Sequence, residues 1–281
     1  MAARKKRWQK VLYLQQSYPD NYVPESFLRD LRKNVNFHWY SMPDIVLASL
    51  NVIQEISLVI IFVEFFWMMQ IDVYQNTIYY TISILTIFLY PLLILSSSDK
   101  NVSGELRTGL IFIIGGFAVS PILKTLTETV STDTIYTMSG IMLIVHLLFF
   151  DYGVQAAIVS PPLSINSVIF AGVCLASRLP TSYHTFALLT LVTDIFVVFP
   201  AFQRRLNQHG PPWLKFLIQI FVAAISFILM IHLGSMYASI LYSILLLSIC
   251  LFFPWRFHEW QRLKENIYGP WDEAILDLKA S

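Results

Sequence analysis

Charge is scarce in this chain. Only 13% of its 281 residues are Asp, Glu, Lys or Arg, whereas 56% are apolar. Because a soluble domain has about a quarter of its residues charged, the composition excludes an ordinary soluble enzyme. The two cysteines, Cys174 and Cys250, both fall inside apolar runs. They form neither a disulfide framework nor a metal-binding spacing, and we expect both to be small apolar side chains in packed helices.

Sequence signals of catalysis are also missing. The chain has no glycine-rich phosphate loop, no Asp-x-Asp metal pair and no array of aspartates of the kind that a lipid phosphotransferase uses. We therefore predict no metal and no cofactor, and we assign no catalytic residue. Such a chain is better suited to a scaffold or to lipid handling than to binding a sugar nucleotide by itself.

Long apolar runs are abundant, and a membrane-spanning helix needs about 20 mostly apolar residues. The sequence predicts an all-α fold, a polytopic membrane bundle of about eight transmembrane helices in residues 45–254. An N-terminal arm (1–44) and a C-terminal tail (255–281) flank the bundle. With eight spans, all but Lys124 and Arg178 of the 19 Lys and Arg residues lie on one side, so the positive-inside rule predicts that both termini are cytosolic. The predicted spans are 45–69, 74–95, 109–123, 135–150, 154–176, 184–202, 213–232 and 236–254.

Both flanking pieces show local organisation. In the arm, Pro24 suits a helix start, and apolar residues from Phe27 to Val35 fall on one face. This pattern indicates an amphipathic helix, either lying on anionic lipid or packed on another subunit. In the tail, Trp260, Leu263 and Ile267 form a second apolar stripe, and we expect an ordered tail that could dock a partner.

Few ionisable groups lie inside the spans. Asn51, Gln54 and Glu55 share one helical face of the first span, His146 lies in the fourth with Asp151 at its end, and the sixth contains Asp194. Two interpretations stay open: hydrogen bonds between helices that fix their packing, or a proton or ion path.

The fifth predicted span contains Ser160-Pro161-Pro162. Two prolines remove two amide donors, and Ser160, Ser164 and Asn166 could satisfy the carbonyls that are freed. A broken helix of this kind indicates either a lipid or substrate site, as in transporters, or a packed kink.

The polar run SPILKTLTETVSTDT, Ser120–Thr134, separates two short apolar stretches and contains Lys124, Thr127, Glu128 and Asp133. The predicted topology puts it on the lumenal side, as a loop or as a re-entrant element. We predict a structural or lipid-lining re-entrant element, in which Lys124 and Glu128 pair one helical turn apart.

Several segments together resemble the phosphatidylinositol glycan class C family over nearly the whole chain. They are WQKVLYLQQSYPDNYVPESFLRDLRKN (Trp8–Asn34), the run Ser120–Ser139, HLLFFDYGVQAAIVS (His146–Ser160), VCLASRLP (Val173–Pro180) and KENIYGPWDEA (Lys264–Ala274). The resemblance implies a multi-pass subunit in the endoplasmic reticulum membrane. Its complex transfers N-acetylglucosamine from UDP-N-acetylglucosamine to phosphatidylinositol, the first step of glycosylphosphatidylinositol anchor synthesis.

The resemblance further implies that catalysis belongs to a different chain, the class A subunit, and that classes H, P, Q and Y are further partners. This chain would then scaffold the catalytic subunit and present the lipid acceptor, a proximity effect. Basic residues could attract the anionic headgroup, although they could equally serve only to set topology. These are Arg29, Arg32, Lys33, Arg204 and Arg205. The alternatives are a lipid transporter or scramblase, and an intramembrane enzyme that acts alone.

Overall fold

The computed structural model describes residues 15–19, 22, 32–34, 37–71, 75–95, 102–127, 129–153, 159–209, 211–233, 236–265 and 267–268. Within them the chain is almost entirely helical. The elements are, in chain order, β1 (Arg32–Lys33), α1 (Met42–Ile71), α2 (Gln75–Leu95), α3 (Val102–Thr125), α4 (Thr132–Phe149), α5 (Pro161–Ala176), α6 (Ser182–Thr193), η1 (Asp194–Val198), α7 (Phe199–His209), α8 (Pro212–Leu233), α9 (Met236–Leu247), η2 (Ser248–Phe252), α10 (Phe253–Trp260), η3 (Gln261–Leu263) and β2 (Ile267–Tyr268).

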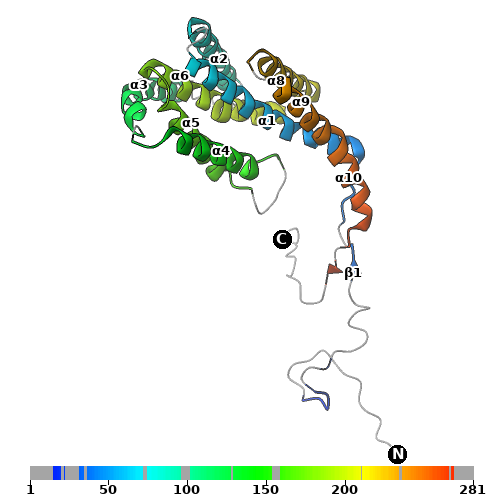
Figure 1. Cartoon of the computed structure of the whole chain (residues 1–281). Helices are drawn as coiled ribbons and strands as arrows, with labels where there is room; N and C mark the ends of the chain where they lie inside the picture. Colours follow the sequence, from blue (N-terminus) through cyan, green and yellow to red (C-terminus); the bar gives the residue numbers. More distant parts are fainter. Residues whose placement is uncertain are drawn as a thin grey trace, which may run out of the picture. The chain divides into compact units, whose positions relative to one another are not determined.

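The helical bundle, residues 42–254, is one compact unit. Helix α1 runs through its middle, with α4 and α5 paired on one side of it and α8 and α9 on the other (Figure 1). The core lies where α1, α5, α6 and η1 meet, and Phe62, Met69, Phe196 and Leu188 are completely buried there. Two turns of π-helix, η1 and η2, interrupt otherwise continuous helices.

Small residues allow α5 and α6 to approach closely. The buried face of α5 carries Ser167, Ala171, Gly172 and Ala176, and a Cβ atom built on Gly172 would lie only 2.6 Å from Cγ2 of Val192 on α6. Close approach of this kind is how helices associate in lipid, where burial of apolar surface supplies little driving force.

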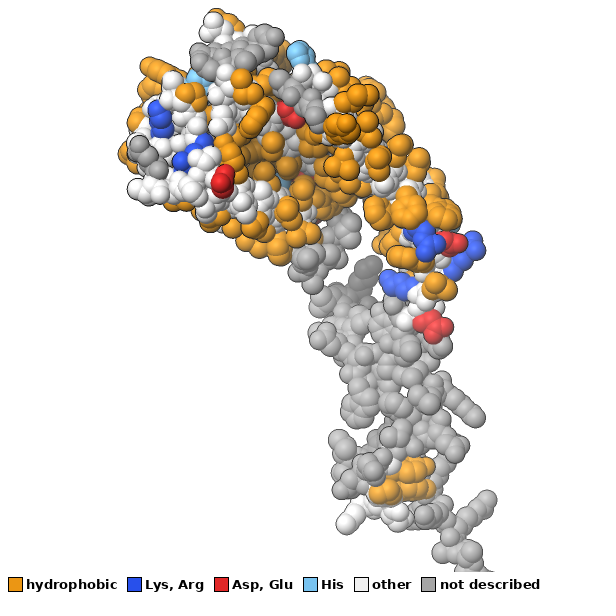
Figure 2. Space-filling view, viewed as in Figure 1, with side chains coloured by type: hydrophobic (Ala, Val, Ile, Leu, Met, Phe, Trp, Pro, Cys, Tyr) orange, Lys and Arg blue, Asp and Glu red, His pale blue; other side chains and the backbone are white. Residues whose placement is uncertain are grey.

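The outer surface of the bundle is apolar. Hydrophobic side chains cover most of the face seen in Figure 2, and large residues such as Phe88, Ile114, Phe221 and Leu241 are strongly exposed. Among the described residues, six helical stretches are long and apolar enough to cross a membrane: Met42–Ile71, Arg107–Thr125, Thr132–Phe149, Ser182–Leu206, Trp213–His232 and Met236–Leu263. The all-α multi-pass membrane fold is therefore confirmed.

The predicted count of about eight spans is approximate. The two remaining predicted spans correspond to α2 and α5. Helix α5 has 16 residues, which is about 24 Å at the usual rise per residue. It begins later than predicted because Pro161 and Pro162 occupy its first two positions, where a missing amide hydrogen costs no helical hydrogen bond. Helix α5 thus starts at these prolines. Residues 154–158, the beginning of the predicted span, lie outside the described residues, so a break between two helical segments stays a prediction.

Parts of the arm and tail form a second unit, made of residues 1–41 and 255–281. Strand β1 pairs antiparallel with β2, with Arg32 opposite Tyr268 and Lys33 opposite Ile267. Gln261 adds a second link, because its side chain accepts from the amide of Tyr40 (2.8 Å) and donates to the Tyr40 carbonyl (3.2 Å). The amphipathic helix predicted up to Val35 lies mostly outside the described residues, and where it is described, at Arg32–Lys33, the chain is extended.

Candidate functional site

Three polar side chains from three helices meet in the bundle core. His146 of α4 contacts the carboxylate of Glu55 on α1 through Nε2 (2.9 Å), and its Nδ1 contacts Oγ of Ser164 on α5 (2.8 Å). Each of the three side chains is at most 1% exposed. Phe196 of η1 packs edge-on against the His146 ring, 4.9 Å between ring centres. This Glu55–His146–Ser164 cluster therefore ties α1, α4 and α5 together.

Two amide pairs lie next to this cluster on α1. Gln54 and Gln203 of α7 donate to each other's carbonyl oxygens at 2.7 and 2.6 Å. One turn earlier, Asn51 donates to the carbonyl of Tyr152 (3.2 Å) and accepts from Nε2 of Gln219 on α8 (2.8 Å). These bonds satisfy amides in a region where water is scarce, and they join α1 to α7 and α8.

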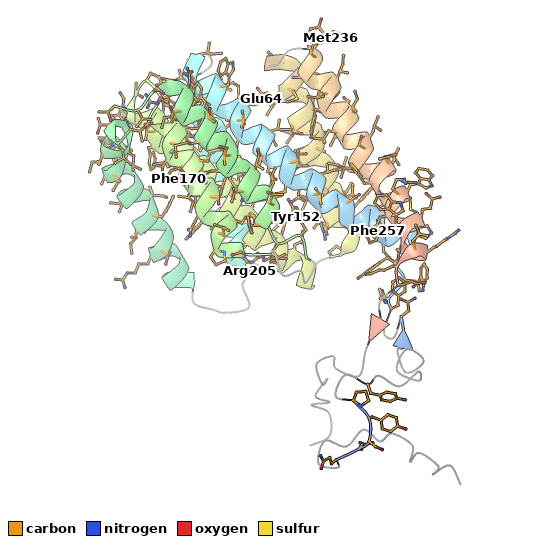
Figure 3. The ribbon with its side chains drawn as sticks, turned by 60° about the horizontal axis from the view of Figure 1, so that its bottom comes forward. Glu64, Tyr152, Phe170, Arg205, Met236 and Phe257 are labelled. Carbon is orange, nitrogen blue, oxygen red and sulfur yellow. The ribbon has the colours of Figure 1, made fainter. Side chains whose placement is uncertain are left out.

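A polar cavity of about 250 Å³ opens beside these amides, at the end of the bundle where α1 begins. Its walls come from α1, the segment after α4, α7 and the start of α8. Two cations line it, Arg204 and Lys215, together with the carboxylate of Asp151. Figure 3 shows Arg205, the neighbour of Arg204, at this end of the bundle and Glu64 at the opposite end. The predicted topology makes this the cytosolic end.

The segment after α4 shapes one wall of the cavity. Oδ1 of Asp151 accepts from the amide of Gly153 (2.9 Å), and Gly153 has a φ of +88°, a conformation that favours glycine. Oδ2 of Asp151 lies 3.7 Å from Nη2 of Arg204. Burial, and secondly the charge of Glu55, raise the pKa of Tyr152. Its phenol therefore stays protonated and donates to the Leu147 carbonyl (2.7 Å).

An apolar groove of about 510 Å³ adjoins this region between α1, α8 and α9. Ile53 of α1, Ala223 and Phe227 of α8 and Leu246 of α9 line it. Gln219 also lines the groove, and this residue is the hydrogen-bond partner of Asn51 in the polar cavity. The groove is therefore the apolar continuation of a polar site.

Asp194 is not a partner in the Glu55–His146–Ser164 cluster. It begins the π-helical turn η1, and its Oδ2 accepts from the hydroxyl of Thr86 on α2 (2.6 Å). It lies in the wall of a second apolar groove, about 530 Å³, between α2, α3 and the continuous helix α6–η1. Glu55 and Asp194 therefore both make hydrogen bonds to side chains of other helices. This is the arrangement expected if the intramembrane polar groups fix helix packing.

The polar run Ser120–Thr134 does not form a separate element. Its first part ends α3, residues 126–131 connect the helices, and its last part begins α4. Helix α3 has 24 residues and extends through the start of the run to Thr125, beyond the predicted span 109–123. Whether the run is a lumenal loop or a re-entrant element stays a prediction. Lys124 donates to the Pro180 carbonyl (2.6 Å). Its predicted partner Glu128 lies outside the described residues.

Arg178 holds the connection between α3 and α4 in place. Its Nη2 donates to the carbonyls of Thr127 (2.5 Å) and Val130 (2.7 Å), and the Thr127 hydroxyl contacts that of Ser177. Asp133 is exposed in the first turn of α4, where a negative charge suits the helix dipole. These residues give the run a structural role at the end of the bundle opposite to the polar cavity.

The remaining predicted site residues are dispersed. Ser160 precedes α5, and its amide donates to the Phe149 carbonyl (3.1 Å), whereas Asn166 is exposed on α5. Arg205 is half-buried on α7. Arg29 lies outside the described residues, and for Arg32 and Lys33 only the backbone is described. The structure thus brings together Glu55 and His146 in one place, and Asp151 and Arg204 in another.

Sequence reasoning missed several residues of the site. Gln203, Gln219, Tyr152 and Lys215 were not selected as candidates, and Ser164 was selected only for freed carbonyls. The glutamines could have been found, because amides inside long apolar runs are as unusual as acids and need partners in lipid. Among the described residues, no three His, Cys, Asp or Glu side chains are grouped so that they could hold a metal ion.

Comparison with known proteins gives a consistent result. Residues 8–272 match the family model described as phosphatidylinositol N-acetylglucosaminyltransferase (GPI2). The chain is 42% identical to the human class C subunit of phosphatidylinositol N-acetylglucosaminyltransferase, covering 96% of this chain and 93% of that protein. It is 33% identical to a putative class C subunit of the same enzyme from Dictyostelium discoideum (96% and 80%), and 27% identical to the GPI2 subunit from Schizosaccharomyces pombe (99% and 89%).

No solved structure matches the chain significantly. The family assignment therefore rests on sequence, through a family model that covers nearly the whole chain and through relatives matched along most of their own length. The chain belongs to the GPI2 family, the class C subunits of phosphatidylinositol N-acetylglucosaminyltransferase.

Proposed function

We propose that this chain is the class C membrane subunit of the complex that transfers N-acetylglucosamine from UDP-N-acetylglucosamine to phosphatidylinositol, the first step of glycosylphosphatidylinositol anchor synthesis. In this role it presents the lipid acceptor and carries the catalytic class A subunit on its cytosolic side. The remaining partners are classes H, P, Q and Y, and the complex works in the endoplasmic reticulum membrane. The family relationship supports the complex and the reaction.

The polar cavity carries the lipid-presenting part of this proposal. Arg204 and Lys215 line a hollow at one end of an otherwise apolar bundle. A cation near a membrane surface contributes about 1 kcal/mol of attraction for anionic lipid. Phosphatidylinositol has one phosphate and a polyol ring, so two cations beside a carboxylate suit its headgroup. Holding the lipid there fixes its hydroxyl for reaction, which is a proximity effect.

The second unit supports the scaffolding part. Arm and tail are joined through β1–β2 and through Gln261 and Tyr40, so two segments distant in sequence form one attachment point. Trp255 and Trp260 are exposed in it, and the guanidinium of the half-buried Arg256 lies over both rings. Deleting residues 261–281, which removes both Gln261 and β2, tests this part. We expect loss of the class A subunit from the purified complex, and retention of a fully active complex would refute tail docking.

A kinetic experiment tests lipid presentation. In the assembled complex, the double variant Arg204→Gln/Lys215→Gln should raise KM for phosphatidylinositol about 30-fold, because two cations at about 1 kcal/mol each are lost. KM for UDP-N-acetylglucosamine should not change. Arg107→Gln is the matched control, because Arg107 is an exposed cation on α3 outside the cavity. An unchanged KM for the lipid in a complex of normal composition would overturn lipid presentation through this cavity.

A further inference from the structure

The polar cavity and the α1–α8–α9 groove meet at one hydrogen bond. Asn51 lines the cavity and Gln219 lines the groove, and Nε2 of Gln219 donates to Oδ1 of Asn51 at 2.8 Å. On α8, Lys215 of the cavity precedes Gln219 by four residues, so both lie on the same face of the helix one turn apart. A bound molecule can therefore have one end in the cavity and the other in the groove.

The groove has the size and lining of a site for one flexible apolar chain. Its volume of about 510 Å³ is within the range typical of small-ligand sites, about 300–1,000 Å³. Ala223 and Ala224 keep it open on α8, and Leu246 and Cys250 line its other side. A transmembrane helix of a partner, which is about 10–12 Å in diameter including its side chains, would leave the polar cavity empty. A lipid with a polar headgroup and an acyl chain would occupy both the cavity and the groove.

The geometry points to a two-part phospholipid site, with a phosphate-bearing polyol headgroup in the polar cavity and one acyl chain in the α1–α8–α9 groove. This inference rests on the proposed function. Arg204 and Lys215 take the phosphate. Asp151, held by the Gly153 amide, accepts a hydroxyl hydrogen bond from the polyol. A sugar nucleotide offers phosphates and hydroxyls as well, but it has no acyl chain for the groove.

Filling the groove without touching the cavity is the central test. In the assembled complex we would measure KM for dioleoyl phosphatidylinositol, and the inhibition constant of glycerophosphoinositol, which has the headgroup but no acyl chain. Ala223→Phe should raise KM for the lipid about tenfold or more, as expected when an apolar pocket can no longer take its ligand. It should leave inhibition by glycerophosphoinositol unchanged. Gly115→Phe is the control, because Gly115 is exposed on α3 with nothing within 4 Å of an added Cβ.

Cross-linking of the wild-type complex provides a second test that does not depend on a variant's folding. Phosphatidylinositol with a photoreactive diazirine in the middle of one acyl chain should label residues 220–227 of α8 and residues 243–250 of α9 and η2. Labelling of the α2–α3 groove around Tyr90 and Gly109 would overturn the inference. Competition by UDP-N-acetylglucosamine for glycerophosphoinositol inhibition, with no acyl labelling of α8 or α9, would assign the cavity to the sugar nucleotide and would also overturn it.

The two sets of variants distinguish the acyl-chain site in the groove from lipid presentation through the cavity. If Ala223→Phe leaves KM for the lipid unchanged while Arg204→Gln/Lys215→Gln still raises it, the acyl-chain assignment is wrong and lipid presentation stands. If the double cation variant changes neither KM for the lipid nor inhibition by glycerophosphoinositol, lipid presentation through the cavity is wrong, and the two-part site is wrong with it.

Discussion

The Glu55–His146–Ser164 cluster gives the sharpest prediction about stability. His146→Leu removes the imidazole and leaves the Glu55 carboxyl, 1% exposed, without the partner 2.9 Å away. Leaving a buried polar group without its hydrogen bond costs about 1–3 kcal/mol, and breaking a buried ion pair costs about 3–5 kcal/mol. A cost of about 2 kcal/mol or more corresponds to about a 30-fold change in the ratio of folded to unfolded protein.

A double-mutant cycle separates this effect from simple loss of volume. We expect Glu55→Leu/His146→Leu to be less destabilised than the sum of Glu55→Leu and His146→Leu. Directly bonded residues couple by about 0.5–3 kcal/mol, and two apolar groups can replace a buried pair at little cost. The control is Glu64→Leu, which removes a half-buried acid on the same helix outside the cluster.

Thermal unfolding of the detergent-purified chain, followed by the fraction that stays monodisperse after heating, is a suitable assay. A loss of about 2 kcal/mol should lower Tm by at least about 4 °C. Additive effects of the two substitutions would refute the reasoning, because they would mean that Glu55 and His146 do not stabilise each other. Equal loss for Glu64→Leu would refute it as well, since any acid of α1 would then matter equally.

Two further predictions concern helix contacts. Gly172→Ala should lower Tm, because the new Cβ would lie 2.6 Å from Val192 and overpacking costs about 1–3 kcal/mol. The double variant Gly172→Ala/Val192→Ala should recover most of the lost Tm, and no recovery would show that the strain lies elsewhere. Arg178→Gln removes the donor to the carbonyls of Thr127 and Val130. A cysteine placed at Thr127 should therefore react faster with an impermeant maleimide when residue 178 is Gln than when it is Arg. An unchanged rate would show that Arg178 does not hold this connection.

The individual helices could be predicted from local composition. The first predicted span, 45–69, agrees closely with α1 at Met42–Ile71, because a run of apolar residues in lipid must form a helix to satisfy its own backbone. Helix boundaries were harder to place, because they depend on position within a helix. Pro161 and Pro162 are compatible with a helix start and with a break, and only the backbone of α5 shows that they occupy its first turn.

The polar run shows the same limit. Lys124 lies in the last turn of a long helix and Thr127 in the turn that follows it, because α3 continues to Thr125. The apolar pattern ends where the side chains become polar, but the helical backbone hydrogen bonds can continue beyond that point, as they do in α3. Here the Pro180 carbonyl accepts from the Lys124 side chain, and Arg178 donates to the Thr127 carbonyl.

The sequence by itself determined that the chain is a multi-pass helical membrane protein and, through its long unusual segments, its family, because hydropathy and ordered sequence matches are local properties of the chain. It also showed that Asn51, Gln54 and Glu55 share one face of a helix, since spacing alone settles that. Only the tertiary structure decided that Glu55 meets His146 and Ser164, that Gln54 meets Gln203, and that Arg204 and Lys215 line one cavity. These partners are 91 and 149 residues apart in the first two cases, and which helices pack together depends on side-chain fit across the whole bundle.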